Sequence, residues 1–393
     1  MGGSVLVSGA GIAGTALAHW LGRYGYRVTV VENAPALREG GQAVDFRGEA
    51  HLTVLERTGV LERLRALDTG GRAGRYVDRR GRQRLALPAE FTGGEVEVHR
   101  GDLVRVLYEA GLPHTEYLFG ESVTSLVETG EGVRVTFRTA APRTFDLVVG
   151  ADGLHSTVRR LAFGPEERYV THLGYYAATW KLPNHLGLGR ETVGLNAPGL
   201  LAQLGGGHSD PAEADAFVVF AAPRLEYDRH DPGQQKALIA ERLAGLGWEA
   251  PALLASLRGA DDLYLDSISR ADVPHWASGR TVLLGDAACG ATIGGMGTGT
   301  AVVGAHVLAG ELARHGGDHG AAFAAYERLL RPYAERCQKG GDRCGAFLAP
   351  GRFGGLLRDA LLNRPRVMAW MLAEGQKVAT MDLPDYPATL AHH

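Results

Sequence analysis

A strand, a glycine-rich turn, a helix and a second strand follow one another in residues 5–32, and this segment constrains the fold more than any other. The turn carries Gly9, Gly11 and Gly14 in the spacing GxGxxG. Gly9 permits a tight turn, Gly11 lets the backbone approach a pyrophosphate, and Gly14 lets the helix pack closely on the strand. Glu32 ends the second strand, where an acid binds a ribose hydroxyl, and the N-terminus of the helix favours phosphate. This βαβ unit predicts a dinucleotide-binding site.

The composition limits the other classes of function. The 393 residues carry 41 Lys and Arg against 44 Asp and Glu, a net charge of −3, which gives no basic surface for nucleic acid. The three cysteines, Cys289, Cys337 and Cys344, are too few and too irregularly spaced for a disulfide framework or a zinc site. No window approaches the roughly 18 apolar residues of a membrane span, and no basic leader precedes the first apolar run. We expect a soluble, cytoplasmic protein that binds neither nucleic acid nor membrane and holds no metal.

The remaining chain predicts an α/β protein with two interwoven domains and a helical C-terminus. Residues 74–88 alternate around Gly81 and predict a hairpin, and short alternating segments between 169 and 227 predict an antiparallel sheet. Helices are expected over 49–56, 100–110, 232–246, 250–257, 300–314 and the last part of the chain, with breaks at Pro332, Pro350 and Pro365. The expected divisions are a Rossmann-like domain (1–73, 89–168 and 270–330), a sheet domain that binds substrate (74–88 and 169–269) and a helical region (331–393).

Three further motifs follow the first one in order. Arg100 begins a helical segment with the pattern RxxL, Asp152 belongs to a DG pair after an apolar strand, and Asp286 belongs to a GD pair after another. Ligands of open α/β sheets bind outside the carboxyl ends of the strands, which is where these two carboxylates fall. The motifs therefore extend the predicted dinucleotide site.

This ordered set resembles the FAD-dependent aromatic hydroxylases of the para-hydroxybenzoate hydroxylase type, over nearly the whole chain. The resemblance implies a GR2-type Rossmann fold with non-covalent FAD. Asp286 would bind the ribityl chain, and Glu32 the adenosine ribose. Residues 295–299 would set backbone N–H groups against the flavin pyrimidine edge, where the start of a helix also favours the negative charge of reduced flavin. The cofactor-binding residues implied are Gly9, Gly11, Ala13, Gly14, Glu32, Asn33, Gln42, Arg47, Arg100, Asp152, Asp286, Gly295, Met296, Gly297, Thr298 and Gly299.

The same resemblance implies a monooxygenase. NADPH or NADH would reduce the flavin, and molecular oxygen would form a C4a-hydroperoxyflavin that hydroxylates or epoxidises a small aromatic or polyketide-like molecule. No second GxGxxG unit is present, so the nicotinamide would bind transiently, with Arg47 as its best contact. We name no catalytic side chain. Candidate substrate-lining residues are Tyr175, Trp180, Gln203 and Phe220.

One segment departs from the family pattern and keeps other functions open. After the GDAA motif the family has an aromatic residue and one or two prolines, whereas this chain has Cys289-Gly-Ala-Thr-Ile-Gly294. The alternative is a flavin-bound pericyclase or cyclase without net redox chemistry. A non-catalytic flavin-bound interaction protein is a second alternative. Consumption of NADPH with and without oxygen discriminates among the three.

Overall fold

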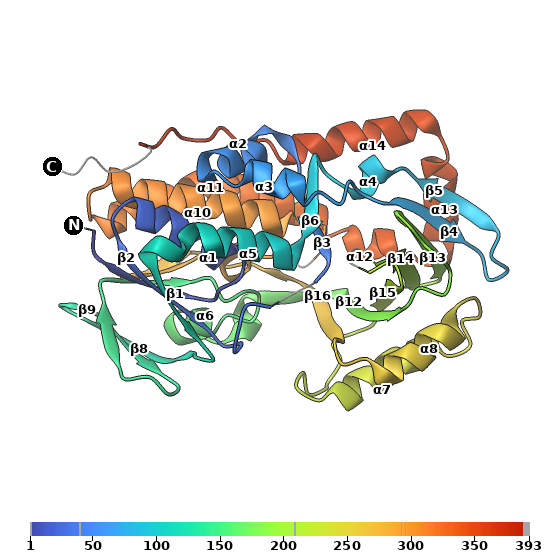
Figure 1. Cartoon of the computed structure of the whole chain (residues 1–393), viewed down its shortest axis with the longest axis horizontal. Coiled ribbons are helices and arrows are strands. Elements are labelled where there is room, and N and C mark those ends of the chain that lie inside the picture. The colour runs from blue at the N-terminus through green and yellow to red at the C-terminus, as the bar shows by residue number, and fades with distance from the viewer. Residues whose placement is uncertain (1, 39–40, 208–209, 292, 295, 388–393) are drawn as a thin grey trace.

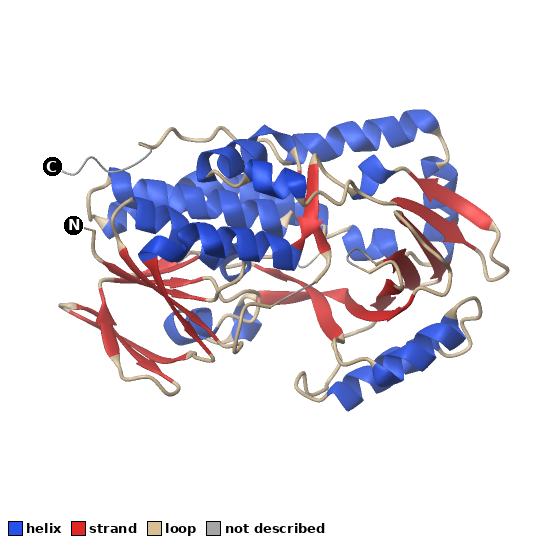
Figure 2. Cartoon of the chain, in the orientation of Figure 1, coloured by secondary structure: helices blue, strands red, loops and turns tan. Residues whose placement is uncertain are grey.

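A six-stranded, mainly parallel sheet forms the centre of one half of the molecule (Figure 2). The computed structural model describes residues 2–38, 41–207, 210–291, 293–294 and 296–387. The strand order is β17-β18-β11-β1-β2-β7, and all neighbours pair in parallel except β17 and β18. The strands are β1 (Ser4–Ser8), β2 (Arg27–Glu32), β7 (Thr115–Phe119), β11 (Leu147–Gly150), β17 (Ala277–Ser278) and β18 (Thr281–Leu283). Their continuous apolar sequences fit a sheet that is covered on both faces.

Long helices cover one face of this sheet and a small sheet with a short helix covers the other (Figure 1). The long helices are α1 (Ile12–Arg23), α5 (Arg100–Gly111), α10 (Gly297–Arg314) and α11 (His319–Gly341). On the opposite face lie β8 (Val123–Thr129), β9 (Gly132–Phe137), β10 (Arg143–Phe145) and α6 (Thr157–Ala162). The smaller elements of this half are β3 (Ala43–Phe46), β6 (Val96–His99), α2 (Gly48–Thr58), α3 (Leu61–Ala66) and α9 (Asp286–Cys289). The short helix α4 (Ala89–Thr92) instead packs against the second sheet (Figure 1). Between α1 and α10 the packing is close, which brings the first and last motifs of the sequence together.

A seven-stranded sheet forms the other half of the molecule. Its order is β16-β12-β15-β14-β13-β4-β5, antiparallel except between β13 and β4. The strands are β4 (Ala73–Val77), β5 (Gln83–Leu87), β12 (Val170–Pro183), β13 (Glu191–Ala197), β14 (Leu200–Gly206), β15 (Glu213–Ala221) and β16 (Tyr264–Ala271). One face packs on α7 (Pro232–Leu243) and α8 (Ala250–Gly259). The other meets α12 (Cys344–Leu348), α13 (Arg352–Leu362) and α14 (Pro365–Val378) (Figure 1).

The predicted fold class is confirmed, and several helices differ from the prediction by two or three residues or lack a predicted break. α10 begins at Gly297, three residues before the expected start. Pro332 lies inside the continuous helix α11, where a break was expected. Proline removes one intrahelical hydrogen bond and disfavours the preceding turn, but the close packing of α11 on α10 and α14 compensates. Within the described residues, none of the helices combines the length and apolarity that a membrane crossing requires.

An ion-paired histidine joins the two halves. His155 follows β11, its Nδ1 lies 2.9 Å from Glu166 Oε1, and its Nε2 lies 3.3 Å from Asp266 Oδ2 on β16. Burial alone would lower the pKa of His155, but the hydrogen bonds to Asp266 and Glu166 outweigh burial and raise the pKa to about 9. The protonated ring therefore links the DG loop to the second sheet.

We expect His155→Gln to remove a stabilisation that depends on pH. Because the folded pKa lies above the unfolded value of 6.5, the contribution is complete below that pH and is lost as the pH rises through 9. A rise in pKa of this size corresponds to roughly 3 kcal/mol. Urea unfolding of the wild-type protein and of His155→Gln between about pH 6 and pH 10 measures this contribution. The free energies of unfolding of the two proteins should converge at the alkaline end. A difference that does not change with pH would contradict the assignment.

Candidate functional site

The glycine turn between β1 and α1 is packed on one side and open on the other. Gly9 has φ +105°, and a Cβ atom there would lie 2.5 Å from the Ala151 carbonyl oxygen. A Cβ atom on Gly14 would lie 1.9 Å from the Gly9 carbonyl oxygen. At Gly11, the N-cap of α1, a Cβ atom would meet nothing within 4 Å. The turn therefore leaves space for a ligand beside Gly11, at the positive end of a helix.

Two neighbours of this turn complete its surroundings. Glu32 accepts hydrogen bonds from the backbone N–H groups of Ala10 and Ala34, both at 2.9 Å, which hold its carboxylate beside the turn. Ala13 is buried and packs against Gly285, the residue before Asp286. The first and last sequence motifs thus form one site. Asn33 is exposed and accepts a hydrogen bond from Arg138, away from this arrangement.

Asp152 and Asp286 differ in the hydrogen bonds that their carboxylates accept. Asp152 accepts hydrogen bonds from the Ser156 hydroxyl and, at 3.1 Å, from the Val158 N–H group, so it holds the start of α6. Asp286 begins α9 and receives no hydrogen bond from any described residue. Burial raises the pKa of Asp286, and Arg100 opposes that effect. Asp286 is therefore a carboxylate that needs donors from a ligand.

The three polar residues expected beside the flavin, Arg100, Gln42 and Arg47, differ in exposure and in whether their side chains already have partners. Arg100 begins α5, is exposed, and its guanidinium pairs with none of the described side chains. Gln42 is exposed, and its backbone carbonyl oxygen accepts a hydrogen bond from the Arg100 backbone N–H at 3.1 Å. Arg47 donates to Asp45 and to the Phe91 carbonyl oxygen, and only 18% of its side chain is exposed. Arg100 is available for an anionic ligand in this arrangement, whereas Arg47 is already bound.

The start of α10 closes the site. Met296, its N-cap, lies in the left-handed region with φ +51°, a strained conformation for a residue with a side chain. Gly297, Thr298 and Gly299 supply first-turn N–H groups that no helical carbonyl can accept. A Cβ atom on Gly297 would lie 3.2 Å from Asp286 Oδ1, so Asp286 and the helix start adjoin. The predicted contact at Gly295 lies outside the described residues.

The second sheet presents one face toward this region. Trp180 and Phe220 pack with α7 and α8 on the opposite face, so they do not line a site shared with the cofactor. Tyr175 lies on the near face with α12 and α14. Gln203 is on that face too, because it pairs across β14 and β15 with Phe217. Two of the four predicted lining residues are thus wrongly placed.

A row of partly exposed side chains crosses this near face. The register pairs Tyr264 with Thr179, Thr179 with Phe217, and Phe217 with Gln203. Tyr264 is 47% exposed and lies within electrostatic reach of Arg100 and Asp286. The row therefore begins near Asp286 and crosses the second sheet. Tyr264 could not be predicted from the sequence, because no local pattern marks which residue of a strand faces the other half of the molecule.

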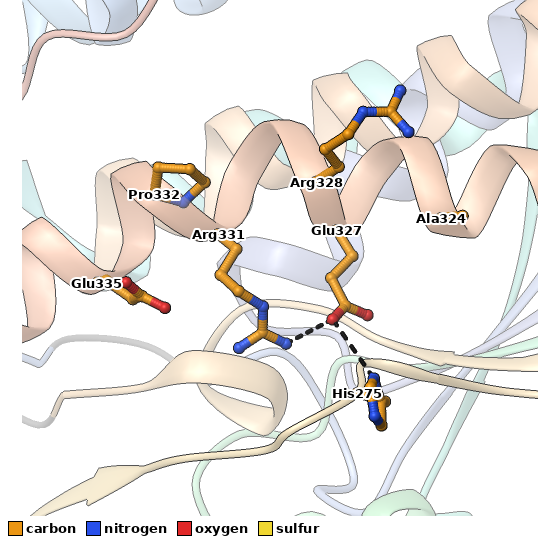
Figure 3. Close-up of a pocket in the computed structure, with 7 residues that line it drawn as sticks. All are labelled: His275, Ala324, Glu327, Arg328, Arg331, Pro332 and Glu335. Atoms are coloured by element: carbon orange, nitrogen blue, oxygen red, sulfur yellow. Dashed lines mark hydrogen bonds and ion pairs between the residues drawn. The ribbon is translucent and has the colours of Figure 1, made fainter.

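Two surface pockets are lined by other residues than those described above. One, of about 460 Å³, lies along α11 and is lined by His275, Ala324, Glu327, Arg328, Arg331, Pro332 and Glu335 (Figure 3). Glu327 lies between Arg331, at 2.6 Å, and His275, at 4.0 Å, so its carboxylate is already paired (Figure 3). The second, of about 170 Å³, reaches Ala288 and Cys289 of α9. No group of His, Cys, Asp and Glu residues in the described ranges could hold a metal ion.

The turn, the helix start and Asp286 fit FAD. Open space at Gly11 suits a pyrophosphate, and an unpaired carboxylate at Asp286 suits hydroxyl donors. A protein built in this way belongs to the class of FAD-dependent enzymes.

Comparison with known proteins gives the family. Residues 3–343 match the family described as FAD binding domain. An uncharacterized protein of Mycobacterium tuberculosis is 44% identical over 342 residues, which are 85% of this chain and 91% of that protein. A flavin-dependent monooxygenase of Legionella longbeachae is 34% identical over 86% of this chain and 87% of its own. The crystal structure of tetracycline destructase Tet(51) is similar with a TM-score of 0.87, at 30% identity, over 98% of this chain and 100% of that one.

The chain belongs to the FAD binding domain family of flavoprotein monooxygenases. The predicted resemblance and enzyme class are confirmed, and so is FAD as the cofactor of the family.

Proposed function

We propose that this enzyme uses NADPH or NADH and molecular oxygen to hydroxylate or epoxidise a small, flat organic molecule. The observation that carries the proposal is the position of Asp286. Its carboxylate lacks a partner among the described residues, adjoins the start of α10, and lies within electrostatic reach of Tyr264 on the second sheet. A ligand held by Asp286 would therefore lie between the half with the parallel sheet and the row of Tyr264, Thr179, Phe217 and Gln203 on the second sheet.

The chain's own residues hold and orient the cofactor. Gly11 and the start of α1 receive the pyrophosphate, Glu32 the adenosine ribose, and Asp286 the ribityl hydroxyls. The first turn of α10 directs N–H groups at the flavin pyrimidine edge and favours negative charge there. Bound FAD supplies the redox and oxygen-activating chemistry, while the protein positions the reactants and excludes water. Three free cysteines suit a reducing compartment, so we place the enzyme in the cytoplasm.

The substrate class follows from the row on the second sheet. Phe217 offers an aromatic surface, and Thr179, Gln203 and Tyr264 offer hydrogen-bonding groups on the same face. Such a surface suits a flat ring system with carbonyl or hydroxyl groups on its edge. Tet(51), to which the chain is similar over its whole length, is a tetracycline destructase. Tetracycline is therefore the first probe.

The nicotinamide is proposed to bind transiently. The sequence contains one complete dinucleotide fingerprint, and FAD occupies it in this proposal. Arg47, our sequence-based candidate for the nicotinamide contact, would first have to leave Asp45 and the Phe91 carbonyl. The exposed Arg100 could contact a phosphate without breaking any pairing among the described residues.

We expect the purified protein to be yellow, to release FAD on heat denaturation, and to convert its substrate only when oxygen is present. The glycine-rich segment after Asp286 replaces stiffer prolines at an entropic cost of roughly 0.5–1 kcal/mol per glycine, which slows oxygenation without abolishing it. The measurement combines NADPH oxidation with mass spectrometry of the product, with tetracycline as probe. The expected product contains one added oxygen atom.

The pericyclase alternative rests on the same proline-free segment. Full conversion under anaerobic conditions, with no NADPH consumed and the flavin left oxidised, would establish it and contradict the monooxygenase. A colourless protein that cannot be reconstituted with FAD would contradict both.

A further inference from the structure

We propose that His51 is a positioning residue that sets the affinity and reduction potential of the flavin by holding the N-terminal turn of α10. The inference rests on the proposed binding of FAD at this turn. His51 is on α2, and its side chain is buried, with 1% exposed. Neither the family motifs nor the predicted site residues include it.

The hydrogen bonds of His51 define one protonation state. The Arg47 backbone N–H donates to His51 Nδ1 at 3.1 Å, so Nδ1 carries no proton. The proton is therefore on Nε2, which lies 2.5 Å from the Tyr333 hydroxyl and donates to it. Burial lowers the pKa of His51 to about 4, although Asp45 raises it slightly, so the ring is neutral at pH 7.

The imidazole fills the space that Gly299 leaves beside α10. A Cβ atom on Gly299 would lie 2.1 Å from both Cε1 and Nε2 of His51, so ring and helix backbone are in direct contact. The resemblance implies that the backbone of Gly299 faces the flavin, and in the structure the His51 ring lies where a side chain on Gly299 would be. His51 is thus a support on the protein side of the helix turn.

Tyr333 extends this support to the strained residue at the helix start. The Tyr333 hydroxyl also lies close enough to the side chains of Thr300 and Cys337 for both to influence its pKa. Thr300 in turn donates to the Met296 carbonyl oxygen from its N–H, at 2.9 Å, and from its hydroxyl, at 3.1 Å. The left-handed conformation of Met296 persists only where its surroundings hold it. The chain of contacts from Arg47 through His51 and Tyr333 to Thr300 provides that constraint.

A functional consequence follows from the electrostatics of the helix. The N-terminus of α10 stabilises negative charge on reduced flavin more than it stabilises oxidised flavin, but only when the turn is fixed. Loosening the turn therefore weakens binding of the reduced form more than that of the oxidised form. This lowers the reduction potential of the bound flavin.

The test compares His51→Leu with His306→Leu. His306 is the matched control, because it is a buried histidine on α10 itself, 2% exposed, whose pKa is lowered by burial to about 4. Its ring packs on Trp20 and Tyr386 and not on the N-terminal turn of the helix. Tyr333→Phe keeps the aromatic ring and removes only the hydroxyl that His51 contacts. It tests the same contact if His51→Leu does not fold. The measurements are the Kd of FAD, the midpoint potential of the bound flavin and the Tm.

We expect His51→Leu to weaken binding of oxidised FAD several-fold and to disfavour the reduced form by a further tenfold, which makes the midpoint about 30 mV more negative. Tyr333→Phe should shift it in the same direction by less, and His306→Leu should lower the Tm alone. The inference would be overturned if His51→Leu and Tyr333→Phe both bound FAD with the same Kd and the same midpoint potential as the wild-type protein. Failure of the wild-type protein to bind FAD would overturn the proposed function as well.

Discussion

Replacing Gly11 with leucine is expected to abolish FAD retention while leaving the fold intact. Gly11 has φ −77°, which leucine adopts without strain, and a Cβ atom at this position meets no protein atom within 4 Å. The side chain would instead occupy the space beside the N-terminus of α1, where the pyrophosphate approaches. We expect FAD affinity to fall more than 100-fold, or roughly 3 kcal/mol or more.

The matched control is Gly14→Ala, three residues further along the same turn. Its Cβ atom would lie 1.9 Å from the Gly9 carbonyl oxygen, so the turn itself must move. This variant should lose thermal stability and soluble yield, whereas Gly11→Leu should keep the Tm of the apoprotein. FAD content after gel filtration and thermal unfolding of the apoproteins measure both effects. Stoichiometric FAD in purified Gly11→Leu would contradict the location of the pyrophosphate.

The sequence predicts the first half of the site because that half is local. Strand, turn, helix and acid lie within residues 5–32, so the spacing of Gly9, Gly11 and Gly14 defines their geometry before any tertiary contact is known. The same holds for the hairpin around Gly81, whose φ of +77° requires glycine at that turn. Features of this kind depend on backbone conformation alone.

The faces of the second sheet depend on packing that no local pattern contains. Alternation along β12 shows that Tyr175 and Trp180 lie on opposite faces, but not which face meets the cofactor half. Helices distant in the sequence decide this: α7 and α8 cover the face with Trp180, and α12 and α14 approach Tyr175. The apolar residues of both faces are alike in composition, so the prediction for Trp180 and Phe220 had no basis for choosing a side.

Polar contacts between residues far apart in the sequence could not be predicted from the sequence either. His51 and Tyr333 are separated by 282 positions, and neither lies in a motif. Arg47 was expected to face a ligand, yet Asp45, two positions before it, takes its guanidinium. Such pairings follow from the final packing of helices against one another and require a structure.

Asp286→Ala is expected to weaken FAD binding roughly 10- to 100-fold, well beyond the effect of Asp152→Ala. Asp286 accepts no hydrogen bond from the described residues, so its loss leaves ligand hydroxyls unpaired, at about 1.5–3 kcal/mol for bonds to a charged group. Asp152 already accepts from Ser156 and Val158. The ligand therefore depends on Asp286, and the fold depends on Asp152.

The same difference predicts opposite effects on the stability of the two apoproteins. Burial raises the pKa of Asp286, so its ionised form is disfavoured in the fold, and the wild-type apoprotein loses stability as the pH rises above the unfolded value of 3.8. At neutral pH, Asp286→Ala should unfold at a higher temperature than the wild-type apoprotein. Burial raises the pKa of Asp152 as well, but its carboxylate accepts hydrogen bonds from Ser156 and Val158. Asp152→Ala should therefore unfold at a lower temperature, because α6 loses the carboxylate that binds its first turn. Titration of both apoproteins with FAD, beside their thermal unfolding at neutral pH, measures the two quantities together. Equal Kd values for FAD, or a destabilised Asp286→Ala apoprotein, would show that Asp286 is a structural residue and that the ribityl chain is held elsewhere.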